Sequence, residues 1–283
     1  MTLQAIARTL SLGYSPCPND TFIFYGLVHG QIDTAGLRFK EVLLDVETLN
    51  RKALGCELDM TKVSFHAFGF LRDAYRLLRS GGALGRGCGP LVVAKGKTSM
   101  EELRGKRIAI PGKLTTANLL LQLYDPALAA GTVVMPFDRI MEAVKGGVVE
   151  AGLVIHESRF TYPDYGLVEV ADLGRWWEGE TGFPLPLGCI IARKSLGEDL
   201  LQTLEGLIRK SIVHAFSHRT GAMGYIKEHS QEMGDDVIGQ HIALYVNDYS
   251  LDLGGGGMAA VEELLKRAED RGIIPGGRNA AVR

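Results

Sequence analysis

The sequence predicts an α/β protein built as two lobes around a central cleft. Short apolar stretches with strand character alternate with longer apolar stretches of helical length, and this alternation is typical of α/β folds. Two short apolar strands, residues 91–94 and 189–193, bracket a middle segment that has strands and helices of its own. We therefore expect a discontinuous first lobe, residues 1–93 plus 191–283, a second lobe over residues 94–190, and two strands that cross between the lobes.

The first part of the chain is a strand, a stiff loop and a helix. An apolar strand over residues 10–14 is followed by Ser15-Pro-Cys-Pro-Asn-Asp20, whose two prolines exclude regular structure. Asn19, Asp20 or Thr21 can cap a helix over residues 22–29. A helix that begins next to a strand end can turn its backbone N–H groups towards a ligand, although capping alone would also explain Asn19 and Asp20.

The next elements follow the same alternation. Residues 37–44 read as a strand, 45–54 as a helix, 60–65 as a strand and 66–78 as a helix. Ser64 lies near a strand end, so its hydroxyl is a candidate ligand contact. The alternative is that Ser64 closes the strand and caps the following helix.

The stretch over residues 80–90 is rich in glycine and carries Gly85-x-Gly87-x-Gly89. A dinucleotide fingerprint would read GxGxxG and lead into a helix, whereas here a strand follows over residues 91–94. We therefore exclude a nicotinamide site of this kind. A loop that borders a cleft fits better, because glycine permits tight turns and close backbone approach.

The middle segment repeats the design of strand, loop and helix. A strand over residues 107–111 precedes an apolar helix over residues 117–124. Thr115 and Thr116 offer two hydroxyls at the helix start, and Lys113 adds positive charge beside them. This combination suits a carboxylate or a phosphate. Capping by one threonine, with the other incidental, is the alternative.

The strand over residues 149–155 ends in His156. Ligands of open α/β sheets bind just past the carboxyl ends of the strands, so a histidine at this position lies where a substrate would sit. A neutral imidazole, with an ordinary pKa of about 6.5, can accept a proton near neutral pH. We predict that His156 is a general base; a histidine that satisfies local backbone is the alternative. Glu157 or Asp164 could orient its ring.

The remaining elements complete the two lobes. The middle segment adds a strand at 133–135, a helix at 137–144 and a strand at 166–171, and the strand over 189–193 is followed by helices at 200–217, 220–230, 235–245 and 258–271. The loops at the strand ends would converge on the cleft between the lobes, as in a small-molecule site that closes by lobe movement.

Composition excludes several other classes of function. The 283 residues are 46% hydrophobic and 23% charged, with a formal net charge of −2, so nucleic acid and anionic membranes are not expected as main partners. No apolar run approaches the roughly 20 residues that span a bilayer, and the first residues lack the pattern of a secretory signal. We expect a cytoplasmic protein with a small-molecule substrate. Exposed apolar helical faces could pair in a homodimer.

The cysteines do not indicate a metal or redox centre. Cys17, Cys56, Cys88 and Cys189 are scattered and form no CxxC pair, a pattern that favours free thiols. Cys17 has no histidine near it in the sequence, so we interpret it as a packing residue or part of a pocket wall. The acidic residues lack the spacing of a metal-binding loop. We therefore expect no metal and no cofactor.

Four stretches together resemble 1,4-dihydroxy-6-naphthoate synthases of the futalosine route to menaquinone. They are residues 15–24 (SPCPNDTFIF), 80–87 (SGGALGRG), 156–162 (HESRFTY) and 185–188 (LPLG). The resemblance implies a type 2 periplasmic-binding-protein-like fold and a cofactor-independent carbon–carbon lyase that converts cyclic dehypoxanthine futalosine to 1,4-dihydroxy-6-naphthoate. It implies His156 as the proton acceptor, and it implies substrate binding by Lys62, Val63, Ser64, Thr115 and Thr116.

Two other functions are compatible with these patterns. A solute-binding protein for a small organic anion would share the architecture, and chorismate dehydratase is a related cleft enzyme of the same pathway. Of the three functions, the synthase is the one that the motifs favour.

Overall fold

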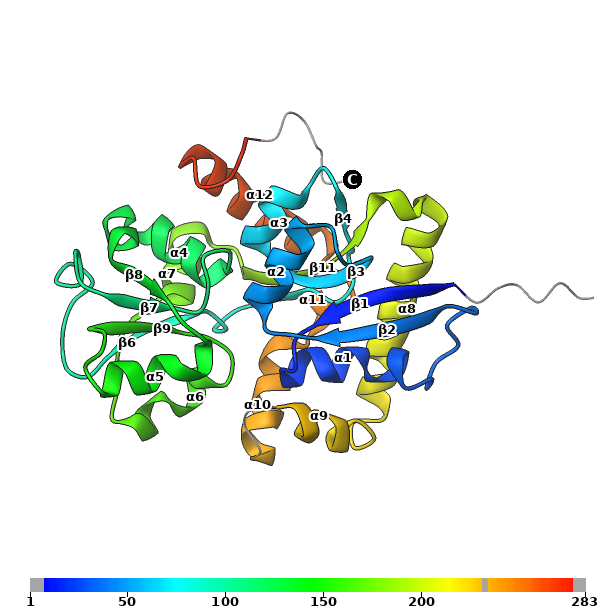
Figure 1. Cartoon of the computed structure of the whole chain (residues 1–283), viewed down its shortest axis with the longest axis horizontal. Helices are drawn as coiled ribbons and strands as arrows, with labels where there is room; N and C mark the ends of the chain where they lie inside the picture. The colour runs from blue at the N-terminus through cyan, green and yellow to red at the C-terminus, as the bar shows by residue number, and fades with distance from the viewer. Residues whose placement is uncertain (1–7, 231–233, 277–283) are drawn as a thin grey trace, which may run out of the picture.

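Two mixed β-sheets organise the chain, one in each of the two lobes that Figure 1 shows side by side. The structure is a computed structural model that describes residues 8–230 and 234–276. Among the described residues, no helix is both long enough and apolar enough to cross a membrane.

The first sheet has the strand order β2-β1-β3-β11-β4, and β5 also pairs with β11. Its strands are β1 (Thr9–Tyr14), β2 (Arg38–Leu43), β3 (Met60–Ser64), β4 (Tyr75–Leu77), β5 (Ala83–Gly85) and β11 (Leu185–Arg193). Strand β1 is parallel to β2 and β3, whereas β11 is antiparallel to β3, β4 and β5. The carboxyl ends of β1 and β3 therefore lie at the same edge of the sheet.

The second sheet has the strand order β10-β6-β9-β7-β8. Its strands are β6 (Leu91–Ala94), β7 (Ile108–Ile110), β8 (Thr132–Val134), β9 (Ala151–Val154) and β10 (Val168–Asp172). Strand β7 is parallel to β8 and β9, and β6 is antiparallel to β9 and β10. The chain enters this sheet through β6 and returns to the first sheet through β11. The predicted fold class, with its two crossing strands, is confirmed. The residue limits of the lobes, 1–93 plus 191–283 and 94–190, stay a prediction.

Helices cover both faces of each sheet (Figure 1). They are α1 (Pro18–Val28), α2 (Val46–Leu54), α3 (Phe65–Leu71), α4 (Thr116–Tyr124), α5 (Phe137–Lys145), α6 (Ser158–Thr161), α7 (Leu173–Thr181), α8 (Glu198–Ser217), α9 (Met223–His229), α10 (Asp235–Tyr245), α11 (Asp248–Leu251) and α12 (Gly254–Asp270), with short 3₁₀ turns η1 (Pro126–Gly131), η2 (Tyr162–Tyr165) and η3 (Lys194–Leu196).

Alternating side chains divide the apolar core among three clusters. In β6, Val92 and Ala94 join the cluster that contains α3, α4 and α12, whereas Leu91 and Val93 point to the opposite face and pack with α5. A third cluster lies between β1 and helices α1, α8 and α10. Strands with apolar side chains on both faces are typical of sheets covered by helices on both sides.

Two expected helices have different limits in the structure. Helix α1 begins at Pro18 rather than at residue 22, so Asn19 and Asp20 belong to its first turn, and Cys17, without a side-chain cap, precedes it. Proline suits this position because the first turn needs no N–H donor there. Helix α3 ends at Leu71, and residues 75–77 form β4, which pairs with β11. Pairing with a distant strand outweighed the local helical pattern.

In the second half of the chain, two predicted elements begin earlier in the structure, the strand over residues 189–193 and the helix over residues 258–271, and one helix was not predicted. Residues 185–188 belong to β11, and the two prolines nearby are accommodated where the pairing with β5 is irregular. The stretch that holds both tryptophans forms α7, capped by Asp172, which accepts from two backbone N–H groups. Helix α12 starts at Gly254, so the glycine run forms its first turn.

Candidate active site

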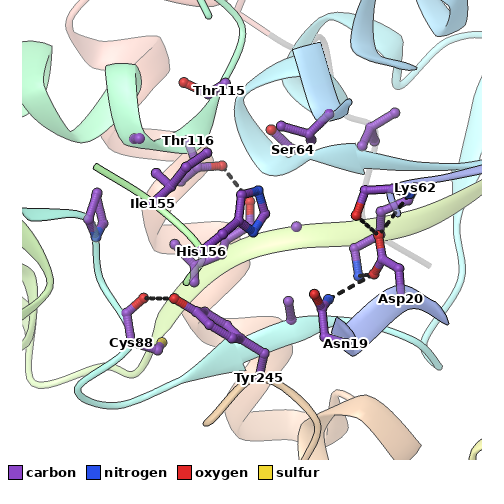
Figure 2. Close-up of a pocket in the computed structure, with 18 residues that line it drawn as sticks. Asn19, Asp20, Lys62, Ser64, Cys88, Thr115, Thr116, Ile155, His156 and Tyr245 are labelled. Atoms are coloured by element: carbon purple, nitrogen blue, oxygen red, sulfur yellow. Dashed lines mark hydrogen bonds and ion pairs between the residues drawn. The ribbon is translucent and has the colours of Figure 1, made fainter. Parts of the chain in front are cut away.

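A cavity lies between the lobes, and it is lined by residues from both (Figure 2). The eight residues expected to bind the substrate or to act as the base all line it: Asn19, Asp20, Lys62, Val63, Ser64, Thr115, Thr116 and His156. They come from the start of α1, the end of β3, the start of α4 and the end of β9. The structure thus brings together the strand ends as expected. Whether these residues bind the substrate stays a prediction.

A buried ion pair forms one wall of the cavity (Figure 2). Lys62 Nζ lies 3.1 Å from Asp20 Oδ1 and donates to the carbonyl of Gly81 at 3.0 Å. The other oxygen of Asp20 accepts from the hydroxyl of Ser15 at 2.8 Å, and Asn19 Nδ2 donates to Oδ1 at 2.8 Å. These contacts neutralise the Asp20 carboxylate, because it is paired with a cation and hydrogen-bonded on both oxygens.

The threonine hydroxyls at the start of α4 are used for capping. Thr115 Oγ1 donates to the carbonyl of Gly112 at 2.8 Å and accepts from the N–H of Asn118 at 3.2 Å. Thr116 Oγ1 donates to the carbonyl of Leu187 at 2.6 Å. Thr115 therefore caps α4, whereas the hydroxyl of Thr116 links α4 to β11 through the carbonyl of Leu187. What α4 presents to a ligand is the backbone N–H groups of its first turn.

Ser64 lines the cavity at the start of α3, and His66 follows in the first turn of that helix. Asn50 holds Ser64 from two sides, because its Oδ1 accepts from the Ser64 N–H at 2.9 Å and its Nδ2 donates to Oγ at 3.3 Å. The Ser64 hydroxyl hydrogen can still donate to a ligand. His66 is buried, and its Nδ1 lies 3.2 Å from the carbonyl of Thr115. Burial lowers the pKa of His66 to about 4, so His66 is a neutral structural residue.

His156 follows β9 with an unusual backbone conformation. Its φ of 55° lies in the left-handed region, which histidine enters more readily than most residues other than glycine. The ring packs edge-on against Phe137, with 5.4 Å between centroids, and lines the cavity. Burial lowers the pKa of His156 to about 4, with Asp20 acting to raise it and Lys62 to lower it. The imidazole is therefore neutral at pH 7 and able to accept a proton.

Cys17 does have a histidine beside it, contrary to the view from the sequence. Its Sγ, a ring nitrogen of His156 and a carboxylate oxygen of Glu157 all lie within 4.8 Å of one another. Of the residues the structure describes, these three have donor atoms close enough to hold a metal ion together. Burial raises the pKa of the Cys17 thiol well above its usual value, and Glu157 raises it further. The protonated thiol is thus neither a good nucleophile nor a ready metal ligand.

A second histidine, which sequence patterns did not indicate, lies behind His156. His241 of α10 is fully buried, and its ring is stacked on that of His156 with 6.0 Å between centroids and 18° between planes. Its Nε2 lies 2.9 Å from Asn19 Oδ1. Tyr245, one turn later, packs on the same ring and lines the cavity. No local signal could have found His241, because 222 positions separate it from Asn19.

Comparison with known proteins identifies the family. Residues 10–270 match the protein family described as menaquinone biosynthesis. The chain belongs to this family. Two curated members are similar over nearly their whole length, and both are named 1,4-dihydroxy-6-naphthoate synthase. The protein of Thermus thermophilus is 53% identical over 94% of this chain and 96% of its own, and that of Streptomyces coelicolor is 46% identical over 95% and 96%.

Solved structures agree with the fold. A protein of Archaeoglobus fulgidus superposes with a TM-score of 0.90 at 40% identity, covering 95% of this chain and 100% of its own. The alkanesulfonate-binding protein SsuA of Xanthomonas axonopodis, bound to MOPS, superposes with a TM-score of 0.72 at 15% identity, covering 96% of both chains. The second similarity establishes a periplasmic-binding-protein-like fold for this member of the menaquinone biosynthesis family.

Proposed function

We propose that this protein is a 1,4-dihydroxy-6-naphthoate synthase that acts on cyclic dehypoxanthine futalosine, with His156 as the general base. The observation that carries the proposal is the neutral imidazole of His156, which faces the interlobe cavity from the end of β9. Its relatives of the same length are named as synthases of this naphthoate.

The cavity suits a substrate that carries a carboxylate. The first turns of α1 and α4 both border it, and the N-terminal end of a helix attracts negative charge. We propose that the N–H groups of Thr116 and Ala117 bind the carboxylate. The hydroxyl of Ser64, on the opposite lobe, would hold a second oxygen of the substrate.

In the proposed reaction His156 removes a proton from the carbon adjacent to the ring ketone. The sugar-derived portion then leaves by cleavage of a carbon–carbon bond, and aromatisation of the bicyclic product drives the reaction forward. Closure of the two lobes would exclude water while the carbanion exists. Asn19, Asp20, Lys62 and Val63 line the same cavity and would contact the rest of the substrate.

One assay separates this function from its alternatives. Purified protein is incubated separately with the cyclic futalosine derivative and with chorismate, and the products are identified by mass spectrometry. We expect naphthoate from the first substrate and no reaction with chorismate. Dehydration of chorismate would identify the dehydratase, and tight binding of the cyclic compound without turnover would favour a solute-binding protein. A homodimer and a cytoplasmic location stay predictions.

The role of His156 is tested by His156→Asn. Asparagine also tolerates the left-handed backbone conformation, so the variant should keep the fold and the cavity but lose the proton acceptor. We expect substrate binding within a fewfold of the parent, measured by calorimetry, and loss of turnover. Near-normal turnover in this variant would disprove the assignment.

A further inference from the structure

The base needs a partner, because proton transfer to His156 creates a positive charge in a partly buried site that has buried neighbours on several sides. We propose that Glu157 and His241 are positioning residues for His156: the Glu157 carboxylate stabilises the imidazolium, and His241 holds the arrangement in place. This inference rests on the proposed role of His156. Asp164, the other acidic residue considered from the sequence, lies on η2 and is exposed, whereas Glu157 is 6% exposed.

The proton on His241 can be assigned from its neighbours. Asp20 is paired with Lys62 and can only accept, so the amide nitrogen of Asn19 is the atom that donates to it at 2.8 Å. The amide oxygen of Asn19 therefore faces His241 Nε2, at 2.9 Å. Since that oxygen can only accept, Nε2 carries the proton. In the neutral ring, Nδ1 is then a proton acceptor.

The acceptor nitrogen of His241 points towards Glu157. Its Nδ1 lies 3.8 Å from Glu157 Oε2, and a carboxylate oxygen of Glu157 lies within 4.8 Å of a ring nitrogen of His156. The carboxyl group thus lies close to both histidine rings, which are stacked on each other. A negative charge on this carboxyl group would therefore lie close to a positive charge formed on His156.

The other charged groups around His156 do not supply this stabilisation. Among the residues that the structure describes, the titratable and charged side chains near its ring are Cys17, Asp20, Lys62, Glu157 and His241. The charge of Asp20 is offset by Lys62 at 3.1 Å, and the buried thiol of Cys17 stays protonated. A second positive charge on His241 would repel the imidazolium of His156. Glu157 is the carboxylate next to His156 in the chain, with an oxygen within 4.8 Å of its ring, and an opposite charge within about 4–6 Å favours the charged form.

The first test needs no substrate. The pKa of His156 is measured by NMR titration of its ring Cε1–H, assigned by the signal missing in His156→Asn, in the parent, Glu157→Gln and the control Asp164→Asn. We expect Glu157→Gln to lower the pKa of His156 by about one unit and Asp164→Asn to leave it unchanged. An unchanged pKa in Glu157→Gln would overturn the proposal, even if the substrate proposed above proves wrong. Nitrogen-15 shifts should show His241 protonated on Nε2; protonation on Nδ1 alone would also overturn it.

The second test follows turnover of the cyclic futalosine derivative. Glu157→Gln should lower kcat about tenfold or more, with KM within about twofold of the parent, because only the charged state of His156 loses its partner. Glu157→Asp should recover part of the loss, and Asp164→Asn should match the parent. If Glu157→Gln and Glu157→Asp lose the same amount of kcat and their Tm values fall equally, Glu157 has a packing role and the proposal is overturned.

Discussion

Asp20 and Lys62 form an ion pair of 3.1 Å in which the side chains are only 2% and 6% exposed. The pair joins the first turn of α1 to β3 and lines the cavity between the lobes. Removing one partner of such a pair leaves a buried charge without compensation, which typically costs about 3–5 kcal/mol.

Lys62→Met should therefore lower the free energy of unfolding by about 3–5 kcal/mol, measured by urea denaturation. The double variant Asp20→Asn/Lys62→Met should lose less than the sum of the two single variants, because no charge is then left unpaired. Lys52→Met is the control, since Lys52 pairs with Glu57 at 2.7 Å on the surface and such pairs contribute about 1 kcal/mol or less. Similar losses of unfolding free energy in Lys62→Met and Lys52→Met would contradict the larger cost predicted for the buried pair.

The pH dependence of turnover should show the low pKa of His156. The base must be neutral to act, and burial lowers its pKa to about 4. We expect kcat/KM to stay level as the pH falls from 7 to 5 and to decline only near pH 4. The measurement is a pH–rate profile, with circular dichroism at each pH to verify that the protein is folded. A midpoint near 6.5 would show that the imidazole is solvated in the working enzyme.

Acid should destabilise the fold through His66. Its pKa is about 4 when folded, against an ordinary value of 6.5, so the unfolded chain binds more protons between these values and stability falls as the pH drops. Between pH 7 and pH 5 this amounts to about 2 kcal/mol. In His66→Asn, whose amide can replace the Nδ1 donor, the loss between pH 7 and pH 5 should be smaller by about that amount. Identical pH slopes in urea denaturation for variant and parent would rule this out.

The glycine-rich loop packs directly on the start of α7. A Cβ at Gly89 would lie 2.3 Å from the Cα of Gly174 and 2.4 Å from its nitrogen, and backbone atoms cannot move aside as a flexible side chain can. Gly89→Ala should therefore destabilise the protein by about 1–3 kcal/mol, which thermal unfolding would detect. Gly96→Ala is the matched control, because a Cβ there meets nothing within 4 Å. If both variants unfold at the same temperature, the close approach is not the reason for glycine at position 89.

Local patterns were sufficient for the fold class and for most elements. Helix α10 has the predicted limits, and β6 lies where the apolar run placed it, because periodicity and turn residues act over a few neighbours. The helix expected over residues 66–78 ends at Leu71 in the structure. Strand β4 follows, and its strand conformation depends on pairing with β11. Helix α12 likewise includes a glycine run that is unfavourable by propensity alone.

The sequence by itself determined that His156 ends a buried strand and that Asn19, Lys62, Ser64 and Thr116 lie near other strand or helix ends. These positions follow from chain order and from the convergence of strand ends in an α/β sheet. Only the tertiary structure decided what each side chain does there. It assigned the threonine hydroxyls to backbone carbonyls, placed Cys17 beside His156, and brought His241 within 2.9 Å of Asn19. The physical reason is that contacts across 222 positions depend on how helices and sheets pack, and no local pattern encodes that packing.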